Sequence, residues 1–120
     1  MGEVGGRGQV EEEKPESRRV FGVTMEEIVA STAEVYGVTV ERIVRSRRGE
    51  ENEARAMAVY LGRQLGGHKL REIGSAVGLE KYSSVSTAYL KMKSRIQQDP
   101  KLARRTRRVE TQLLRRQRQT

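Results

Sequence analysis

The stretch Leu70–Ser94, LREIGSAVGLEKYSSVSTAYLKMKS, decides the fold of this chain of 120 residues. Apolar residues recur in it at helical spacing, which predicts a short helix ending before Gly78 and a longer helix after the turn Gly78–Lys81. Their inner faces would carry Leu70, Ile73 and Val77, and then Val85, Tyr89, Met92 and Ile96. A short helix, a turn of about four residues and a longer helix form the pattern of a helix-turn-helix.

The start of the second helix is the candidate DNA-reading end, because this end of a helix-turn-helix enters the major groove. It carries Lys81, Tyr82, Ser83 and Ser84, followed on the outer side by Ser86, Thr87 and Lys91. These side chains are polar, short or basic, as contacts to base edges and phosphates require. Taken alone, the pattern fits an ordinary helical hairpin equally well, because short motifs match many unrelated proteins.

Composition points to a polyanionic partner. The chain has 24 Lys and Arg against 16 Asp and Glu, a net charge of +8, which favours nucleic acid first and an anionic membrane surface second. It has no Cys, which excludes disulfides and thiolate zinc sites. Four Tyr and one Phe are few for a single-strand binder. There is no long apolar run and no signal-peptide pattern, so we expect a cytoplasmic protein.

Charge also divides the chain. Residues 1–44 have a net charge of −4 and residues 45–120 a net charge of +12, so the positive field belongs to the part with the candidate DNA-reading helix. Residues 1–22 are rich in Gly and Glu and are predicted to be a flexible tail. We therefore expect one folded domain over residues 23–116, with a short C-terminal tail at 117–120.

Four more helices are predicted from their ends. A capping box at Thr24–Glu27 opens the first, Thr39 caps a short second, acidic residues at 50–53 start the third, and Asp99-Pro100 opens the last, which runs to about Arg116. The expected core residues of these helices are Met25, Ile28, Val29, Thr32, Val35 and Tyr36; Val40, Ile43 and Val44; Ala54, Met57, Ala58, Leu61 and Leu65; and Leu102, Val109, Leu113 and Leu114.

Two basic segments lie outside the helix-turn-helix. The loop Arg45-Ser46-Arg47-Arg48-Gly49 is either a solvated charge run or a DNA contact, and Arg55 at the start of the third helix could reach a phosphate. Residues 101–120 have a net charge of +7, which fits a solvated and partly frayed helix, a non-specific phosphate-binding arm, or an amphipathic helix for a membrane or a partner. The single His68 has no partners for metal or nucleophile chemistry and is interpreted as junction structure.

From Thr24 to about Leu114 the chain resembles the C-terminal DNA-binding domain of the bacterial replication initiator DnaA, and the related C-terminal module of some REP-associated tyrosine transposases. The matching pieces are Ile28-Val29, Tyr36–Glu41, Ser46–Arg48, Ala54–Leu61, Leu70–Gly74, Ser83–Val85 and Asp99–Leu102. This resemblance implies an all-α fold of the Trp-repressor type that docks helix 83–96 in the major groove. It also implies that Arg47 reaches the adjacent minor groove, that Arg55 holds phosphate, and that Ser83 and Ser84 touch phosphate and thymine methyls.

The chain departs from the initiator where the initiator reads its origin box. Leu79-Glu80-Lys81-Tyr82 stands in place of the initiator's Gly-Arg-Asp-His, and Ala56 in place of a Gln. The Tyr-Ser-Ser-Val-Ser run from Tyr82 to Ser86 looks closer to the transposase-associated form. The initiator's ATPase phosphate loop and the transposase's paired histidines are both missing from the sequence.

These features predict a double-stranded-DNA-binding domain with sequence preference. Its expected DNA contacts are Arg45, Arg47, Arg48, Arg55, Lys69, Lys81, Tyr82, Ser83, Ser84, Thr87 and Lys91. The alternative is a non-specific basic protein that binds RNA or associates with the ribosome, although it lacks the aromatic platforms of RNA modules. We expect no enzymatic activity, cofactor, metal, small-molecule substrate or membrane partner. We also expect a monomer in the bacterial nucleoid, with a dimer left open.

Overall fold

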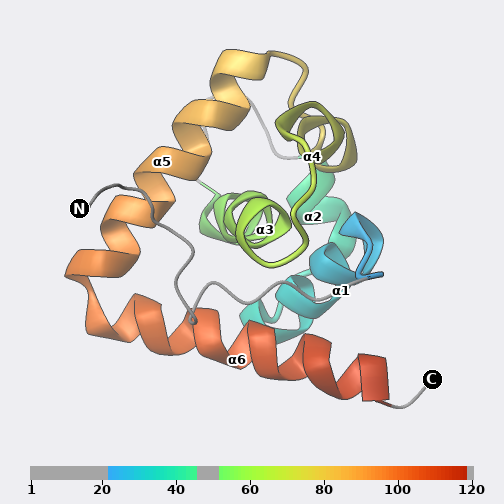
Figure 1. The fold of residues 1–120 in the computed structure, drawn as a ribbon, viewed down its shortest axis with the longest axis vertical. Coiled ribbons are helices and arrows are strands. Elements are labelled where there is room, and N and C mark those ends of the chain that lie inside the picture. The colour runs from blue at the N-terminus through green and yellow to red at the C-terminus, as the bar shows by residue number, and fades with distance from the viewer. Residues whose placement is uncertain (1–21, 46–51, 119–120) are drawn as a thin grey trace, which may run out of the picture.

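The structure is a computed structural model that describes residues 22–45 and 52–118, and all regular elements in these ranges are α-helices (Figure 1). They are α1 (Met25–Tyr36), α2 (Val40–Val44), α3 (Glu53–Gln64), α4 (Leu70–Val77), α5 (Tyr82–Gln98) and α6 (Pro100–Arg118). The predicted all-α fold is therefore confirmed for the described residues, and α6 continues two residues beyond its predicted end at about Arg116.

The central element is α3, around which the other helices pack (Figure 1). It contacts α1, α4 and α5 on different sides, which explains why Val59 is as fully buried as the predicted core residues Met57, Ala58 and Leu61. In Figure 1, α6 runs along one end of the molecule, against α1 and α5, whereas α4 and the start of α5 lie at the other end. The turn of the helix-turn-helix and the start of α5 thus lie at the opposite end of the molecule from the C-terminal helix.

The helix ends follow the predicted capping chemistry. The Thr24 hydroxyl accepts a hydrogen bond from the Glu27 amide at 3.1 Å, and the Glu27 carboxylate accepts one from the Thr24 amide at 3.0 Å. Thr39 caps α2 through the Arg42 amide. The start of α3 was expected at residues 50–53, and in the structure Asn52 is its N-cap and Glu53 its first residue. Each cap gives a side-chain acceptor to an amide of the first helical turn, where the carbonyl of a preceding turn is missing.

Most of the predicted core is confirmed, with one error and several half-buried positions. Val40 was expected to point inward but is 46% exposed, because α2 is only five residues long and directs a single residue, Ile43, fully into the core. The half-buried members are Val35, Tyr36, Val44, Leu70, Tyr89, Ile96 and Leu114. Two further residues of α1, Ser31 and Ala33, are buried because this helix packs on both α3 and α6.

The C-terminal helix is part of the core. Leu102, Val109 and Leu113 are buried, and so is Thr106, whose hydroxyl donates a hydrogen bond to the Leu102 carbonyl at 2.9 Å. The interpretation of residues 101–120 as a solvated helix therefore holds for its charged side, which is exposed, and not for its apolar side, and the described part is helical as far as Arg118 without fraying. The apolar stripe is sparse in the sequence, but α6 packs against α1 and α5, and Leu102, Val109 and Leu113 belong to the main hydrophobic core.

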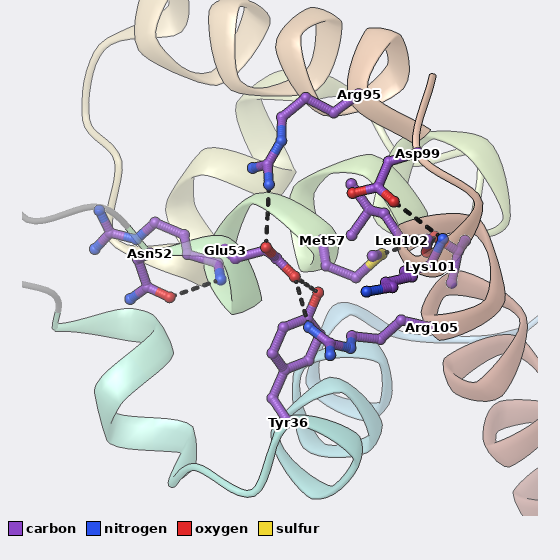
Figure 2. Close-up of polar contacts among 11 residues, drawn as sticks. Tyr36, Asn52, Glu53, Met57, Arg95, Asp99, Lys101, Leu102 and Arg105 are labelled. Atoms are coloured by element: carbon purple, nitrogen blue, oxygen red, sulfur yellow. Dashed lines mark hydrogen bonds and ion pairs between the residues drawn. The ribbon is translucent and has the colours of Figure 1, made fainter. Parts of the chain in front are cut away.

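A polar hub at the N-terminus of α3 joins four helices (Figure 2). The Glu53 carboxylate accepts hydrogen bonds from the Tyr36 hydroxyl at 2.6 Å, from Arg105 at 3.0 Å and from Arg95 at 3.2 Å. Burial acts to raise the pKa of Glu53, but these three hydrogen bonds outweigh it and hold the pKa below its ordinary value. The hub fixes α5 and α6 relative to α1 and α3.

Candidate nucleic-acid interface

The predicted helix-turn-helix is formed by α4, the turn 78–81 and α5. Gly78 ends α4 with a left-handed φ of +76°, which favours glycine. In α4, a Cβ placed on Gly74 would lie 2.7 Å from the Leu79 carbonyl oxygen and 2.7 Å from Val85 Cγ2. The two helices can therefore approach closely only because this position has no side chain.

The turn packs against the end of α2. A Cβ on Gly78 would lie only 2.2 Å from the carbonyl oxygen of Val44. Arg55 lies at the same junction, where its Nε donates a hydrogen bond to the Ile43 carbonyl at 3.0 Å. Its guanidinium is half-buried, and burial lowers its pKa. Arg55 thus supports the contact between α2 and the turn, and its predicted phosphate contact remains a prediction.

Asn52 is a positioning residue that the sequence analysis did not single out. Its side-chain oxygen accepts a hydrogen bond from the Arg55 amide at 3.0 Å, and its side-chain nitrogen donates one to the Arg42 carbonyl at 2.9 Å. It therefore ties the end of α2 to the start of α3, on either side of segment 46–51. An Asn directly before a predicted helix is a strong capping signal, and it could have identified this residue.

The basic loop is only partly within the described residues. Arg47 and Arg48 lie outside them. Arg45 ends α2, is exposed, and forms an exposed ion pair with Glu41 at 3.6 Å. An ion pair with both partners in solvent is weak, so it leaves Arg45 able to exchange Glu41 for a phosphate.

A groove between α3 and α5 collects four of the predicted contact residues. On the α5 side it is lined by Ser83, Ser84, Thr87 and Lys91, followed by Ala88, Met92 and Arg95. On the α3 side it is lined by Asn52, Glu53 and Ala56. Arg95 is a cation in the groove that the sequence analysis missed, and it faces the groove because Glu53 holds it there.

The remaining predicted contacts lie outside this groove. Tyr82 is 65% exposed and borders a second hollow, which is formed with α4 and includes Arg71, Ser75 and Glu80. Lys81 is the exposed N-cap of α5. Lys69 is the exposed N-cap of α4 and borders neither hollow. The structure therefore divides the predicted residues between the two flanks of α5 and the start of α4.

The start of α5 has the electrostatic character of an anion-binding end. The first turn contains no acidic residue, and the Lys81 side chain does not cap it. The first amides of a helix lack carbonyl partners and carry the positive end of its dipole, which attracts phosphate. The Ser84 amide donates to the Lys81 carbonyl at 3.1 Å, and the exposed Ser83 and Ser84 add hydroxyl groups at this positive end of the helix.

Other kinds of site find no support in the described ranges. No group of three or more His, Asp or Glu side chains lies close enough there to hold a metal ion. None of the helices described is both long and apolar enough to cross a membrane. His68 Nε2 lies 2.8 Å from the Val23 carbonyl oxygen, so it ties the α3–α4 junction to the residue before α1, in agreement with its interpretation as junction structure.

Comparison with known proteins agrees with this geometry. The family model described as the bacterial DnaA protein helix-turn-helix matches residues 25–92, from the first residue of α1 into the second half of α5. A search of curated proteins finds no match to the chain. The matched region contains the groove and both helices of the helix-turn-helix, and membership of this family supports binding of double-stranded DNA. More than half of the chain is covered, so the chain belongs to the bacterial DnaA helix-turn-helix family.

Proposed function

We propose that the chain binds double-stranded DNA with sequence preference, by placing the start of α5 in the major groove. The observation that carries this proposal is the groove that Ser83, Ser84, Thr87 and Lys91 line together, from the first turn of α5, where no side chain caps the helix, to its middle. The major groove of B-DNA is wide enough to admit an α-helix, and short polar side chains near its N-terminus can meet base edges there.

Each residue is given the role that its chemistry allows. Ser83 and Ser84 hydrogen-bond to phosphate or base edges at the positive end of the α5 dipole, and the methyl group of Thr87 packs on a thymine methyl. Lys91 and the half-buried Arg55 contact phosphates. Arg47 enters the neighbouring minor groove, Arg45 and Arg48 contact phosphates beside it, and Lys69 contacts the DNA backbone at the start of α4.

The altered turn changes which bases are preferred. Lys81 stands where the initiator has an Asp, and a carboxylate at this position accepts hydrogen bonds, for example from the cytosine amino group. The ammonium group of Lys81 can only donate them. At a base edge Lys81 therefore selects guanine, which presents two acceptors in the major groove. Tyr82 lies on the other flank of α5, so its contact with DNA is beside the protein groove between α3 and α5 and not within that groove.

We propose that the chain acts as a monomer. Among the described residues the exposed large apolar side chains are Val40, Tyr82 and Leu90. Val40 belongs to α2, whereas Tyr82 and Leu90 lie at opposite ends of the first half of α5. These three side chains therefore do not form one contiguous patch of the size typical of a stable dimer interface.

Selection of binding sites from random duplex DNA at physiological salt tests the proposal, and an enriched motif is the expected result. With about five phosphates neutralised, log affinity should fall with log salt at a slope of about −4 to −5. Ser84→Ala and Lys81→Ala should each cost about 1–3 kcal/mol on the selected site and much less on random DNA. Ser94→Ala is the matched control, because Ser94 is an exposed serine of α5 outside the groove.

Two results would contradict sequence preference. Salt-dependent binding without an enriched motif would leave a non-specific nucleic-acid protein, and tighter binding of structured RNA than of duplex DNA at equal salt would favour the RNA alternative. Equal losses from Lys81→Ala on all sequences would move this residue from base reading to phosphate binding.

A further inference from the structure

The outer face of α6 carries cations that the fold does not use. Five basic side chains on it are exposed, and among the described residues no ion pair engages them: Lys101, Arg104, Arg107, Arg108 and Arg115. By contrast, Arg105 and Arg116 on the inner flank form ion pairs with Glu53 and Glu34, each at 3.0 Å. The helix therefore has structural cations on one side and available cations on another.

The available cations form a continuous stripe. At 100° per residue, positions 104, 108 and 115 fall within one narrow sector of the helix, flanked by 101 and 107, and the stripe is about 21 Å long at 1.5 Å per residue. Arg104, Arg107, Arg108 and Arg115 also line one shallow groove, together with Val35 of α1 and with Thr111 and Gln112. This cluster of guanidinium groups suits the regularly spaced phosphates of a nucleic-acid backbone.

The stripe is remote from the proposed DNA-reading end. α5 has 17 residues and separates its own first turn from α6 by about 25 Å. In Figure 1 the start of α5 and α4 lie at one end of the longest axis, which measures 47 Å, and α6 lies at the other. The stripe also lies on the side of α6 away from the buried Leu102, Val109 and Leu113, so it faces away from the rest of the fold. A duplex docked on the start of α5 therefore leaves most of the stripe uncovered, and the stripe needs a different occupant.

The packing of α6 distinguishes between the anionic partners. A membrane-surface helix must insert its apolar face into the lipid. In α6 that face is buried in the core through Leu102, Val109 and Leu113, so only its charged side is available. A chain already bound to DNA also meets other DNA segments at high local concentration. The geometry thus favours a second duplex over a membrane.

We propose that the outer face of α6 binds the phosphate backbone of a second DNA duplex, so that one molecule bridges two DNA segments. The inference rests on the proposed function, because α5 must hold the first duplex. Contact by Arg and Lys to phosphates carries no base information, so the second duplex is bound without sequence preference.

The test uses the full chain, beads that carry a duplex with the selected site, and a labelled free duplex of unrelated sequence. One variant combines Arg104→Gln, Arg107→Gln, Arg108→Gln and Arg115→Gln. The control variant combines Arg7→Gln, Lys14→Gln, Arg18→Gln and Arg19→Gln, which removes the same number of charges from residues 1–22. Four quantities are measured: the labelled duplex captured, the capture of anionic phospholipid vesicles offered in place of the labelled duplex, the affinity for the selected site alone, and the melting temperature.

The α6 variant should lose more than about tenfold of the captured duplex, because its phosphate contacts supply the affinity for the second segment. Its affinity for the selected site should change by less than about threefold, since general charge loss is a small term at physiological salt. Its melting temperature should not change, because all four side chains are exposed. The control variant should capture as much labelled duplex as the unmodified chain.

Several results would overturn the bridging proposal. Normal affinity for the selected site with no capture of the labelled duplex would refute bridging and leave the proposed function intact. Equal losses in the two variants would assign capture to net charge, and full capture by the α6 variant would assign it to dimers. Capture of anionic lipid vesicles but not of duplex would assign the face to a membrane. If the chain binds no duplex in the direct affinity measurement, the proposed function itself fails.

Discussion

Replacing Gly78 by Ala tests the packing on which the helix-turn-helix depends. Two costs arise at this position. The left-handed φ of +76° is unfavourable for an L side chain by about 1–2 kcal/mol. In addition, the new methyl carbon would lie 2.2 Å from the Val44 carbonyl oxygen, a backbone atom that cannot rotate away. Overpacking of this kind costs about 1–3 kcal/mol, so the total expected for Gly78→Ala is about 2–5 kcal/mol.

Gly37→Ala is the matched control. Gly37 also ends a helix with a left-handed φ, of +68°, but nothing lies within 4 Å of a Cβ placed there. It should therefore show only the backbone cost of about 1–2 kcal/mol. The difference between the two variants isolates the collision with α2, because helix-ending geometry is common to both.

Urea and thermal unfolding of both variants measure these costs. One kcal/mol corresponds to about 4–8 °C in the melting temperature of a domain of this size. Gly78→Ala should also bind duplex DNA more weakly than Gly37→Ala at temperatures where both are folded, because relief of the collision moves the turn away from α2 and Arg55. Equal unfolding free energies in the two variants would refute the argument, since they would show that the turn does not press on α2.

Three further predictions concern charged side chains. Glu53→Gln should destabilise the fold by about 1.5–3 kcal/mol at neutral pH, because it removes charge-assisted hydrogen bonds. Since the pKa of Glu53 is lowered in the folded state, its stabilising contribution is present above the unfolded pKa of about 4.5 and is lost as pH falls through the folded pKa. In acid unfolding the variant should therefore lose less stability than the unmodified chain. Arg105→Ala should lower the melting temperature, whereas Arg104→Ala should leave it unchanged and reduce capture of a second duplex; a similar melting temperature for both would contradict the division of α6. Arg55→Lys should cost about 0.5–1.5 kcal/mol in chemical unfolding, because Lys lacks the Nε that bonds the Ile43 carbonyl, and unchanged stability would show that this bond is dispensable.

Local chemistry made much of this fold predictable. The capping box at Thr24, the cap at Thr39 and the stop at Gly78 depend on neighbours a few residues away, so the sequence contains all the information they need. The inner faces of α3 and α5 follow the same way from helical spacing. The exception at Val40 has a physical reason, since a single helical turn is too short for periodicity to define its inner face.

The candidate site was less predictable, because it depends on which helices meet. Sequence reasoning identified Ser83, Ser84, Thr87 and Lys91, which share a helix and could be placed by spacing. It did not show that Arg95 would join them, since that position is set by Glu53, forty-two residues earlier in the chain. Likewise, the role of Arg55 at the end of α2 requires a contact between two helices that no local pattern encodes.

The acidic residues explain how one basic helix acquires two kinds of surface. The carboxylates of Glu53 and Glu34 pair with Arg105 and Arg116, so the cations nearest α1 and α3 are neutralised and hold the helix in place. Arg105 gains further from stacking over the Tyr36 ring, with its guanidinium carbon 5.1 Å from the ring centroid. Arg104 is rotated by 100° from Arg105 and meets none of these groups. Of the net charge of +7 over residues 101–120, the charges of Arg105 and Arg116 stabilise the fold through these ion pairs. The exposed cations that remain form the stripe with which α6 can hold a second duplex.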